Sequence, residues 1–240
     1  MEILGVKVDN VTFQEALEKA KKLIDSGGKY YIVTPNPEII VKAQKDREFK
    51  EILNKASLSI PDGIGLVWGA KILGVKLSER VTGTDLLEGL ATLSAEHGYN
   101  VFLLGAGEGI AEKAAQVLKN RYSNLKIAGT YEGQAASEFD SFARGRLAKL
   151  KIDILAVAYG APKQERWIAR NLPHLNVKLA IGVGGALNYI SGEKPRAPGL
   201  VQRLGLEWLF RLIRQPWRIR RQLVLPYFAY LVFREKLKKT

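Results

Sequence analysis

A carboxylate in a glycine turn is the residue of this sequence best placed for acid–base chemistry. Asp62 lies between Pro61 and Gly63 at the end of a strand-like run, and the glycine lets the backbone turn sharply. From such a turn the carboxylate can face a pocket and act as a general base. The alternative is that Asp62 caps the helix that follows, and the spacing by itself favours the cap.

A second turn, TPNP (34–37), carries side chains that can hydrogen-bond a sugar. Thr34 offers a hydroxyl and Asn36 an amide, on a loop that two prolines stiffen. These groups suit sugar hydroxyls or an N-acetyl group. Asn36 can equally be the N-cap of the next helix, with Pro37 in its first turn, and the residues alone leave both interpretations open.

Two more polar side chains occupy candidate turns. Gln164 can orient a sugar or a uracil edge, whereas its neighbours Lys163 and Glu165 are expected to be solvated. Arg80 precedes another helix, for which Thr84 is the expected N-cap, and a forked guanidinium can stabilise a leaving diphosphate. Without further context, Arg80 reads as an ordinary surface arginine.

Glycine-rich turns follow two other strand-like runs. Gly105 and Gly107 lie in GAGEG (105–109), ahead of an alanine-rich helix whose N-terminus can receive a nucleotide phosphate or ribose. The spacing matches neither the dinucleotide fingerprint nor a P-loop, so the signal is weak. Gly185 ends a similar turn, GVGG (182–185), and is a further candidate for substrate contact.

These turns separate strand-like from helix-like segments in regular alternation, which predicts a doubly wound, mostly parallel α/β sheet of Rossmann-like type. The strand-like runs are Tyr30–Thr34, Ser57–Pro61, Asn100–Leu104, Lys126–Tyr131, Ile154–Tyr159 and Lys178–Val183. The helical patterns are Glu38–Ala56, Gly65–Leu73, Asp85–His97, Ile110–Arg121, Glu138–Lys149 and Gln164–Asn171. Ahead of them, Ile3–Val8 resembles a short edge strand, and Thr12 and Glu15 have capping-box spacing. Because ligands bind outside the carboxyl ends of parallel strands, the turns are expected to meet at one active-site rim.

Positive charge is concentrated at the C-terminal end. Residues 1–193 hold 25 Lys/Arg and 22 Asp/Glu, whereas residues 194–240 hold 12 Lys/Arg and 2 Asp/Glu. Four arginines of the tail are candidates for binding a diphosphate or anionic lipid. On a continuous helix they would fall within roughly an 80° arc. They are Arg211, Arg214, Arg218 and Arg221. The tail is expected to be helical with interruptions at Pro216 and Pro226, and its aromatic residues suit a lipid headgroup layer. A packed helical cap or an oligomer interface is the alternative.

We therefore expect an α/β catalytic domain over residues 1–195 and a helical, membrane-associating appendage over residues 196–240. The sequence has no Cys, two His and no DxD pair, so no metal or cofactor is expected. It shows no signal peptide, and its longest apolar stretch near the end, at about 11 residues, is too short to span a bilayer. These features predict a cytoplasmic protein, peripheral on the inner face of the membrane; a homo-oligomer is left open.

Together the motifs resemble those of one enzyme family. TPNPEI (34–39), PDGIG (61–65), RVTGTDL (80–86), GAPKQE (160–165) and the stretch from VGGALNYISGEKPRAP (183–198) through GLEWLFRLI (205–213) are similar to the WecG/TagA/CpsF glycosyltransferases. The similarity extends over nearly the whole chain and is closest to the TagA branch, N-acetylmannosamine transferases of wall teichoic acid synthesis.

The resemblance implies a metal-independent, inverting hexosyltransferase. Its donor would be UDP-N-acetylmannosamine, and its acceptor undecaprenyl-diphosphate-linked N-acetylglucosamine. The family's proposed base falls on Asp62, which reverses the preference for a helix cap. The other motif residues fall on Thr34, Asn36, Arg80 and Gln164.

One departure bears on the donor, because many relatives carry Asp where this chain has Asn188. The alternative within the family is a different UDP-sugar, such as UDP-N-acetylmannosaminuronic acid. Outside the family, a dehydrogenase or methyltransferase is disfavoured because the strand ending at Tyr131 lacks an acidic ribose-binding residue. A nucleic-acid-binding protein is suggested by the pI of about 9.8, but the balanced charge of the body opposes it, so no nucleic acid is expected as a partner.

Overall fold

A six-stranded, wholly parallel sheet forms the centre of the molecule, with strand order β4-β3-β8-β7-β5-β6. This computed structural model describes residues 1–239, without the side chains of Arg218, Arg220 and Lys239. The strands are β3 Tyr30–Val33, β4 Leu58–Ser59, β5 Asn100–Gly105, β6 Lys126–Tyr131, β7 Ile152–Ala158 and β8 Val177–Gly182. The predicted doubly wound α/β fold is confirmed.

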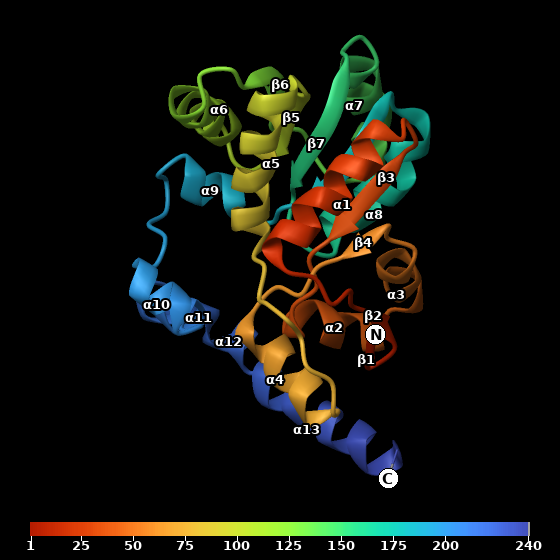
Figure 1. Ribbon diagram of the computed structural model, residues 1–240, viewed down its shortest axis with the longest axis vertical. Coiled ribbons are helices and arrows are strands. Elements are labelled where there is room, and N and C mark those ends of the chain that lie inside the picture. The colour runs from red at the N-terminus through yellow and green to blue at the C-terminus, as the bar shows by residue number, and fades with distance from the viewer. Residues whose placement is uncertain (240) are drawn as a thin grey trace.

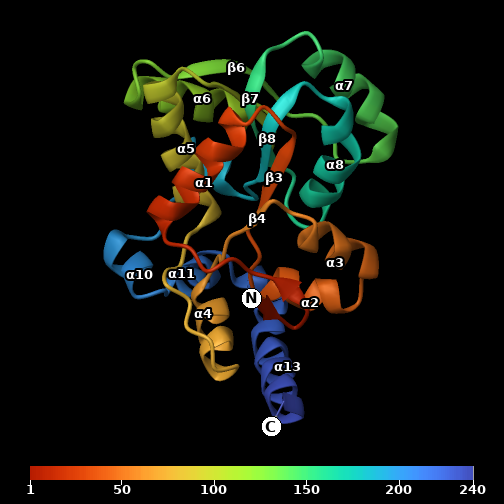
Figure 2. The same cartoon turned by 45° about the vertical axis from the view of Figure 1, so that its right-hand side comes forward.

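Helices cover both faces of the sheet (Figures 1 and 2). One core lies under α1 (Phe13–Asp25), α5 (Gly83–His97), α6 (Ile110–Arg121) and α9 (Ala186–Ile190). The opposite core lies under α7 (Asp140–Leu147) and α8 (Lys163–Asn171). Alternate residues of 101–104 in β5 and of 154–158 in β7 enter the two cores, so both strands are apolar apart from Asn100 and Asp153 near their starts, as is typical of a sheet buried on both faces.

A third core packs beside the sheet and joins the two ends of the chain. It unites the β1–β2 hairpin (Glu2–Ile3 and Val6–Lys7) with α2 (Pro37–Gln44), α3 (Arg47–Asn54), α4 (Ile64–Ile72) and α13 (Val224–Lys239). Phe228, Leu231 and Val232 of α13 are buried there. The last helix is therefore packed against the body, as the helical-cap alternative expected, and the proposed division at residue 195 does not separate two independent cores.

Several predicted elements need correction. The expected helix Glu38–Ala56 is two helices, because Asp46 accepts a hydrogen bond from the backbone N–H of Phe49 and starts α3. The expected edge strand at the start is a separate hairpin. Thr82 rather than Thr84 caps α5, since its hydroxyl accepts from the N–H of Asp85. The capping box of α1, between Thr12 and Glu15, is confirmed.

The C-terminal helices run along one side of the molecule (Figure 1). They are α10 Gly199–Arg203, α11 Glu207–Arg214, α12 Ile219–Gln222 and α13. The predicted break at Pro216 is confirmed, whereas Pro226 lies in the first turn of α13, where a helix tolerates proline. Within residues 1–239, none of the helices combines the length and apolar character needed to cross a bilayer.

Candidate active site

A cavity of about 1000 Å³ opens at the carboxyl ends of β3, β4, β7 and β8. The loops after these strands form one wall, α4 a second, and the C-terminal helices the third. Eight of the predicted site residues line it: Thr34, Asn36, Asp62, Arg80, Gln164, Gly185, Arg211 and Arg221. The structure thus brings together side chains that lie almost 190 positions apart in the sequence, at the edge where the turns were expected to meet.

Asp62 lies in the loop between β4 and α4 and is not a helix cap. Gly63 is the N-cap of α4, with φ of 95°, and no side chain caps this helix. The backbone N–H of Asp62 donates to the carbonyl of Pro35 at 2.9 Å, which fixes the loop against the turn that carries Thr34 and Asn36. The capping alternative is therefore wrong, and the carboxylate is among the groups that line the cavity.

The surroundings of Asp62 tune its acidity. Burial is the largest influence and raises the pKa of this carboxyl from 3.8 to about 6, while the nearby Arg211 lowers it. Glu207 raises the pKa, and Arg80 and the backbone N–H of Gly83 lower it. The residue as a whole is partly buried and lines the cavity. A carboxylate with a pKa near 6 is still ionised at neutral pH and is a better proton acceptor than an ordinary aspartate.

Thr34 and Asn36 flank Asp62 from the end of β3. Asn36 caps α2, because its side-chain oxygen accepts from the N–H of Ile39 at 3.0 Å. The two interpretations of Asn36 are compatible, since the residue also lines the cavity. Thr34 is buried, and its hydroxyl donates to the carbonyl of Gly182 at 3.3 Å, joining the ends of β3 and β8.

Gln164 is built into the cavity wall. Its Oε1 accepts from the backbone N–H groups of Gly160 and Gly184, both at 3.0 Å, so one side chain ties together the loops after β7 and β8. Its Nε2 donates to Oε1 of Glu165 at 2.8 Å. With these three bonds, Gln164 chiefly holds the shape of the wall.

Glu165 is not solvated, contrary to expectation. Its side chain is completely buried, and burial raises its pKa to about 7, against a lowering contribution from Gln164. Lys163 is exposed, as predicted. The motif spacing contains no signal for the difference, because only the tertiary packing of α8 decides which polar residue faces inward.

Arg80 and Arg211 converge on one buried carboxylate. Glu207, the first residue of α11, lies 3.6 Å from Arg80 and accepts a hydrogen bond from Arg211 at 2.5 Å. Arg80 also donates to the carbonyl of Gln202 at 3.0 Å, so it is no ordinary surface arginine. The ring of Tyr189 lies 4.8 Å from the Arg211 guanidinium. Sequence reasoning missed Glu207 and Tyr189; the signal for Glu207 was an isolated acid in a strongly basic tail.

The expected row of tail arginines does not form one face, because the chain breaks after α11. Arg211 and Arg221 line the cavity, and Arg221 pairs with Glu38 at 2.7 Å. Arg214 is exposed and lies over the ring of Phe210, outside the cavity lining. The side chain of Arg218 lies outside the described part of the chain, so its proposed contact stays a prediction.

The glycine turn after β5 does not line the cavity. Gly105 has φ of 99°, and a Cβ at this position would come within 3.0 Å of the backbone of Ala158. A close approach of β5 to β7 therefore accounts for this glycine. Gly107, like Gly105, is absent from the cavity lining, so nucleotide contact at this turn stays a prediction without support from the cavity.

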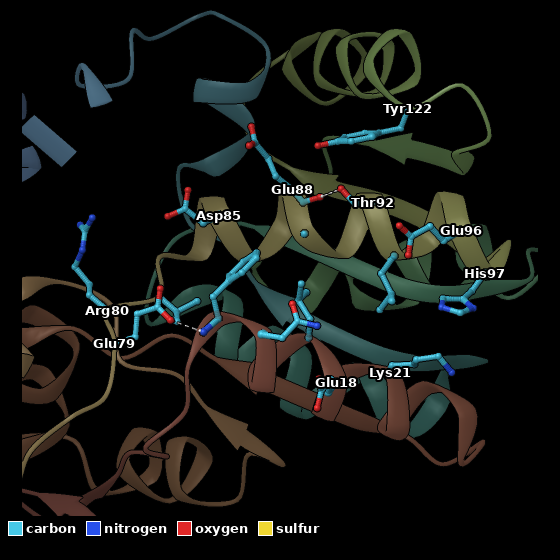
Figure 3. Close-up of a pocket in the computed structure, with 16 residues that line it drawn as sticks. Glu18, Lys21, Glu79, Arg80, Asp85, Glu88, Thr92, Glu96, His97 and Tyr122 are labelled. Atoms are coloured by element: carbon cyan, nitrogen blue, oxygen red, sulfur yellow. Dashed lines mark hydrogen bonds between the residues drawn. The ribbon is translucent and has the colours of Figure 1, made fainter. Parts of the chain in front are cut away.

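A second hollow, a groove of about 830 Å³, runs between α1 and α5 (Figure 3). Arg80 is the single lining residue that it shares with the first cavity. Glu18, Glu79 and Glu96 are exposed along it. A groove with this many carboxylates repels a nucleotide diphosphate, and its place beside the helices rather than at the strand ends argues against an active site.

The fold and the first cavity define the class of protein: an α/β protein with a carboxylate of raised pKa and two cationic side chains at the carboxyl ends of its strands, an arrangement suited to group transfer from a phosphorylated donor. The chain belongs to the glycosyl transferase WecG/TagA/CpsF family, whose model matches residues 1–240. It is thus a glycosyltransferase, and the dehydrogenase and methyltransferase alternatives are set aside.

Two relatives carry the same name, N-acetylglucosaminyldiphosphoundecaprenol N-acetyl-beta-D-mannosaminyltransferase. The protein from Bacillus subtilis (strain 168) is 36% identical over 231 residues, covering 95% of this chain and 88% of the relative. The protein from Staphylococcus aureus (strain MRSA252) is 33% identical over 240 residues, covering 99% and 94%. The similarity therefore includes both the sheet and the C-terminal helices.

Proposed function

We propose that this chain transfers N-acetylmannosamine from UDP-N-acetylmannosamine to undecaprenyl-diphosphate-linked N-acetylglucosamine, a linkage-unit step of wall teichoic acid synthesis. The names of the two relatives support this donor and acceptor. The single observation that carries the proposal is the position of Asp62, whose carboxylate shares a cavity with Arg80 and Arg211. The reaction needs a base for the acceptor hydroxyl and cations for the departing diphosphate.

Asp62 is the base in this scheme. It removes the proton from the acceptor hydroxyl, whose oxygen attacks the anomeric carbon of the donor while the bond to the β-phosphate breaks. The proton ends on Asp62 and the electron pair leaves with UDP. The name of the relatives specifies a β-linked product, so an α-linked sugar nucleotide reacts with inversion.

The cationic side chains would stabilise the charge that develops on the departing UDP. Arg80 and Arg211 already lie beside a buried carboxylate, Glu207, which holds them in place before the substrate arrives. Because they are preorganised, little reorganisation accompanies the reaction. This arrangement supports a transfer that does not depend on a metal ion.

The experiment measures UDP release with UDP-N-acetylmannosamine and a short-chain lipid-diphosphate-N-acetylglucosamine, in the presence of chelator. We expect turnover by the wild type and a loss of roughly 10²–10⁴-fold in Asp62→Ala, the usual scale for a general base. Asp25→Asn, at the exposed end of α1, is the matched control. Asp62→Ala with activity near that of the control would remove the base from the scheme.

The same assay decides the donor. UDP-N-acetylmannosaminuronic acid is offered alongside UDP-N-acetylmannosamine, because Asn188, the position at which this chain departs from the family pattern, lines the cavity. A preference for the uronic acid would refute the proposed donor and leave the base assignment intact.

Membrane association at the cytoplasmic face completes the proposal, with the basic C-terminal helices as the contacting part. Truncation near Gly199 tests it in liposome co-sedimentation, and equal sedimentation of the two chains would refute it. Truncation would also remove Arg211 from the cavity and uncover the core that Phe228 fills. Point substitutions on the exposed surface are therefore the cleaner test.

A further inference from the structure

The side-chain amide of Gln164 is held through both of its polar atoms. Its Oε1 accepts from the backbone N–H groups of Gly160 and Gly184, and its Nε2 donates to Oε1 of Glu165. The two bonds to the oxygen fix one atom of the amide, whereas the bond from the nitrogen fixes the plane of the group. Glu165 is therefore the contact that decides where the second N–H of Nε2 points.

Gly182, the last residue of β8, packs directly against this amide. A Cβ added to Gly182 would come within 2.6 Å of Nε2 of Gln164 and within 3.0 Å of its Cδ. Gly182 does not have the left-handed backbone that commonly requires glycine. The close approach of the Gln164 amide thus accounts for the glycine.

The carboxyl of Glu165 departs from the core pattern of α8. The residue is completely buried, in line with Ile168 and Leu172, which belong to the core under this helix. An apolar side chain at this position would bury similar surface without the cost of removing a carboxyl from water. Such local departures from the pattern are expected where a residue serves a site.

An ion pair does not account for Glu165. Lys42 is a nearby cation that lowers the pKa of this carboxyl. Its Nζ, however, donates to Oε1 of Glu38 at 2.8 Å and to the carbonyl of Ala161 at 3.3 Å. Within residues 1–239, Oε2 of Glu165 has no hydrogen-bond partner, and Gln164 supplies the one side-chain hydrogen bond to the carboxyl. The contact that this buried acid makes is therefore with the cavity wall.

The Gln164 amide lies at the same end of the cavity as the carboxylate of Asp62. Its Nε2 lies beside Gly182, whose carbonyl accepts from the hydroxyl of Thr34. The turn after Thr34 holds Asp62, whose backbone N–H donates to the carbonyl of Pro35. Gln164 and Asp62 both line the cavity. Because two backbone donors already occupy Oε1, Gln164 can offer a ligand only its second N–H, a hydrogen-bond donor.

We propose that Glu165 is a positioning residue for sugar transfer: it fixes the Gln164 amide so that the free N–H donates to an oxygen of the transferred sugar. The inference rests on the proposed function for the identity of the ligand, a hexosamine joined to UDP. The group that faces Gln164 is then a hydrogen-bond acceptor, which suits the carbonyl oxygen of an N-acetyl group. A sugar hydroxyl cannot donate to Gln164, because Oε1 has no free lone pair.

The test compares two substitutions of Glu165. Glu165→Leu removes the acceptor at similar volume, whereas Glu165→Gln keeps an oxygen to accept from Gln164. We expect kcat/KM for UDP-N-acetylmannosamine to fall about tenfold in Glu165→Leu, the scale of one hydrogen bond to the substrate, and to stay near the wild-type value in Glu165→Gln. Lys163→Leu, at an exposed position next to these residues, is the matched control.

Two further measurements separate positioning from a general loosening of the wall. The Kd of UDP, which lacks the sugar, is expected to be the same in Glu165→Leu and the wild type, whereas a loosened wall would weaken UDP as well. Gly182→Ala displaces the same amide from the opposite side, so it should reproduce the loss of kcat/KM. Thermal unfolding establishes that each variant is folded.

A spectroscopic readout separates this inference from the proposed function. In NMR spectra of the isotope-labelled chain, the side-chain amide signal that Gln164→Leu removes belongs to Gln164. We expect slow hydrogen exchange of this amide in the wild type and Glu165→Gln, and rapid exchange in Glu165→Leu. This pattern without any sugar transfer would support the positioning and refute the function. Rapid exchange in the wild type would overturn the positioning, as would wild-type kcat/KM in folded Glu165→Leu and Gly182→Ala or a matching loss of UDP affinity.

Discussion

The cavity at the strand ends and the groove between α1 and α5 are hollows of similar size, about 1000 and 830 Å³, and they share Arg80. They differ in how their carboxylates are held. In the groove, Glu18, Glu79 and Glu96 are exposed to water (Figure 3). In the cavity, burial raises the pKa of Asp62 to about 6.

The difference shows that the surroundings of a hollow, and not its size, determine the state of its carboxylates. Exposed carboxylates remain hydrated, and water screens whatever charge lies near them. Asp62 has lost much of that water and faces Arg211 and Arg80 instead. Its protonation state is therefore sensitive to the cations that would also receive the diphosphate, so the two halves of the proposed reaction would be coupled electrostatically.

The largest difference in activity between changes in the cavity and changes in the groove is expected for Arg211, the cation that most lowers the pKa of Asp62. Arg211→Ala should lower kcat about 10²-fold, the scale of one lost charge-stabilising donor. The substitution also leaves the buried Glu207 with Arg80 as its one remaining partner of the two, which adds a loss of stability. Steady-state UDP release measures the effect.

The control for this change is Arg121→Ala. Arg121 pairs with Glu88 at 2.8 Å on the groove side of the molecule, so its removal deletes a more exposed ion pair outside the cavity. Equal losses in Arg121→Ala and Arg211→Ala would indicate a general effect on folding and would end the distinction between the two hollows.

The pH dependence of the reaction is the next largest effect. A base with a pKa of about 6 must lose its proton to work, so kcat/KM should be level at neutral pH and fall about tenfold per unit below pH 6. In Arg211→Ala the midpoint should move to higher pH, because Arg211 lowers the pKa of Asp62. A profile whose midpoint stays in place in the variant contradicts the coupling.

The fold was predictable because the strands bury both faces. Runs such as Ile154–Tyr159 are apolar without alternation, which is typical of parallel strands, and the structure places Ile152–Ala158 at the middle of the sheet. Helix boundaries inside one long apolar pattern were less accessible. Asp46 divides this pattern into two helices, because its side chain accepts a hydrogen bond from the backbone N–H of Phe49. An aspartate on the solvated face of one continuous helix would give the same sequence pattern.

The site was predictable where residues lie at strand ends and unpredictable where packing decides. Asp62 and Asn36 follow strands whose carboxyl ends meet, so topology alone brings them together. Glu207 reaches the same cavity from the C-terminal helices, whose path no local pattern encodes. The close approach of two strands accounts for Gly105, so this glycine does not by itself indicate a ligand, and its predicted substrate contact stays a prediction.

Substitution of Glu165 by Gln is expected to change turnover least, but it is the most direct test of whether this carboxylate is buried from water. Its pKa is raised from 4.5 to about 7, so the folded chain holds a proton there that the unfolded chain releases. The stabilisation that this proton confers is complete below pH 4.5 and is lost as pH rises through about 7.

Glu165→Gln cannot ionise and keeps an oxygen to accept from Gln164, so its free energy of unfolding should fall less between pH 5 and pH 8 than that of the wild type. The difference should be on the order of 3 kcal/mol in urea titrations at the two pH values. Glu96→Gln is the exposed control. If the free energy of unfolding depends on pH in the same way in Glu165→Gln and in the wild type, the Glu165 carboxylate is hydrated in solution. Burial would then not distinguish the cavity wall from the groove.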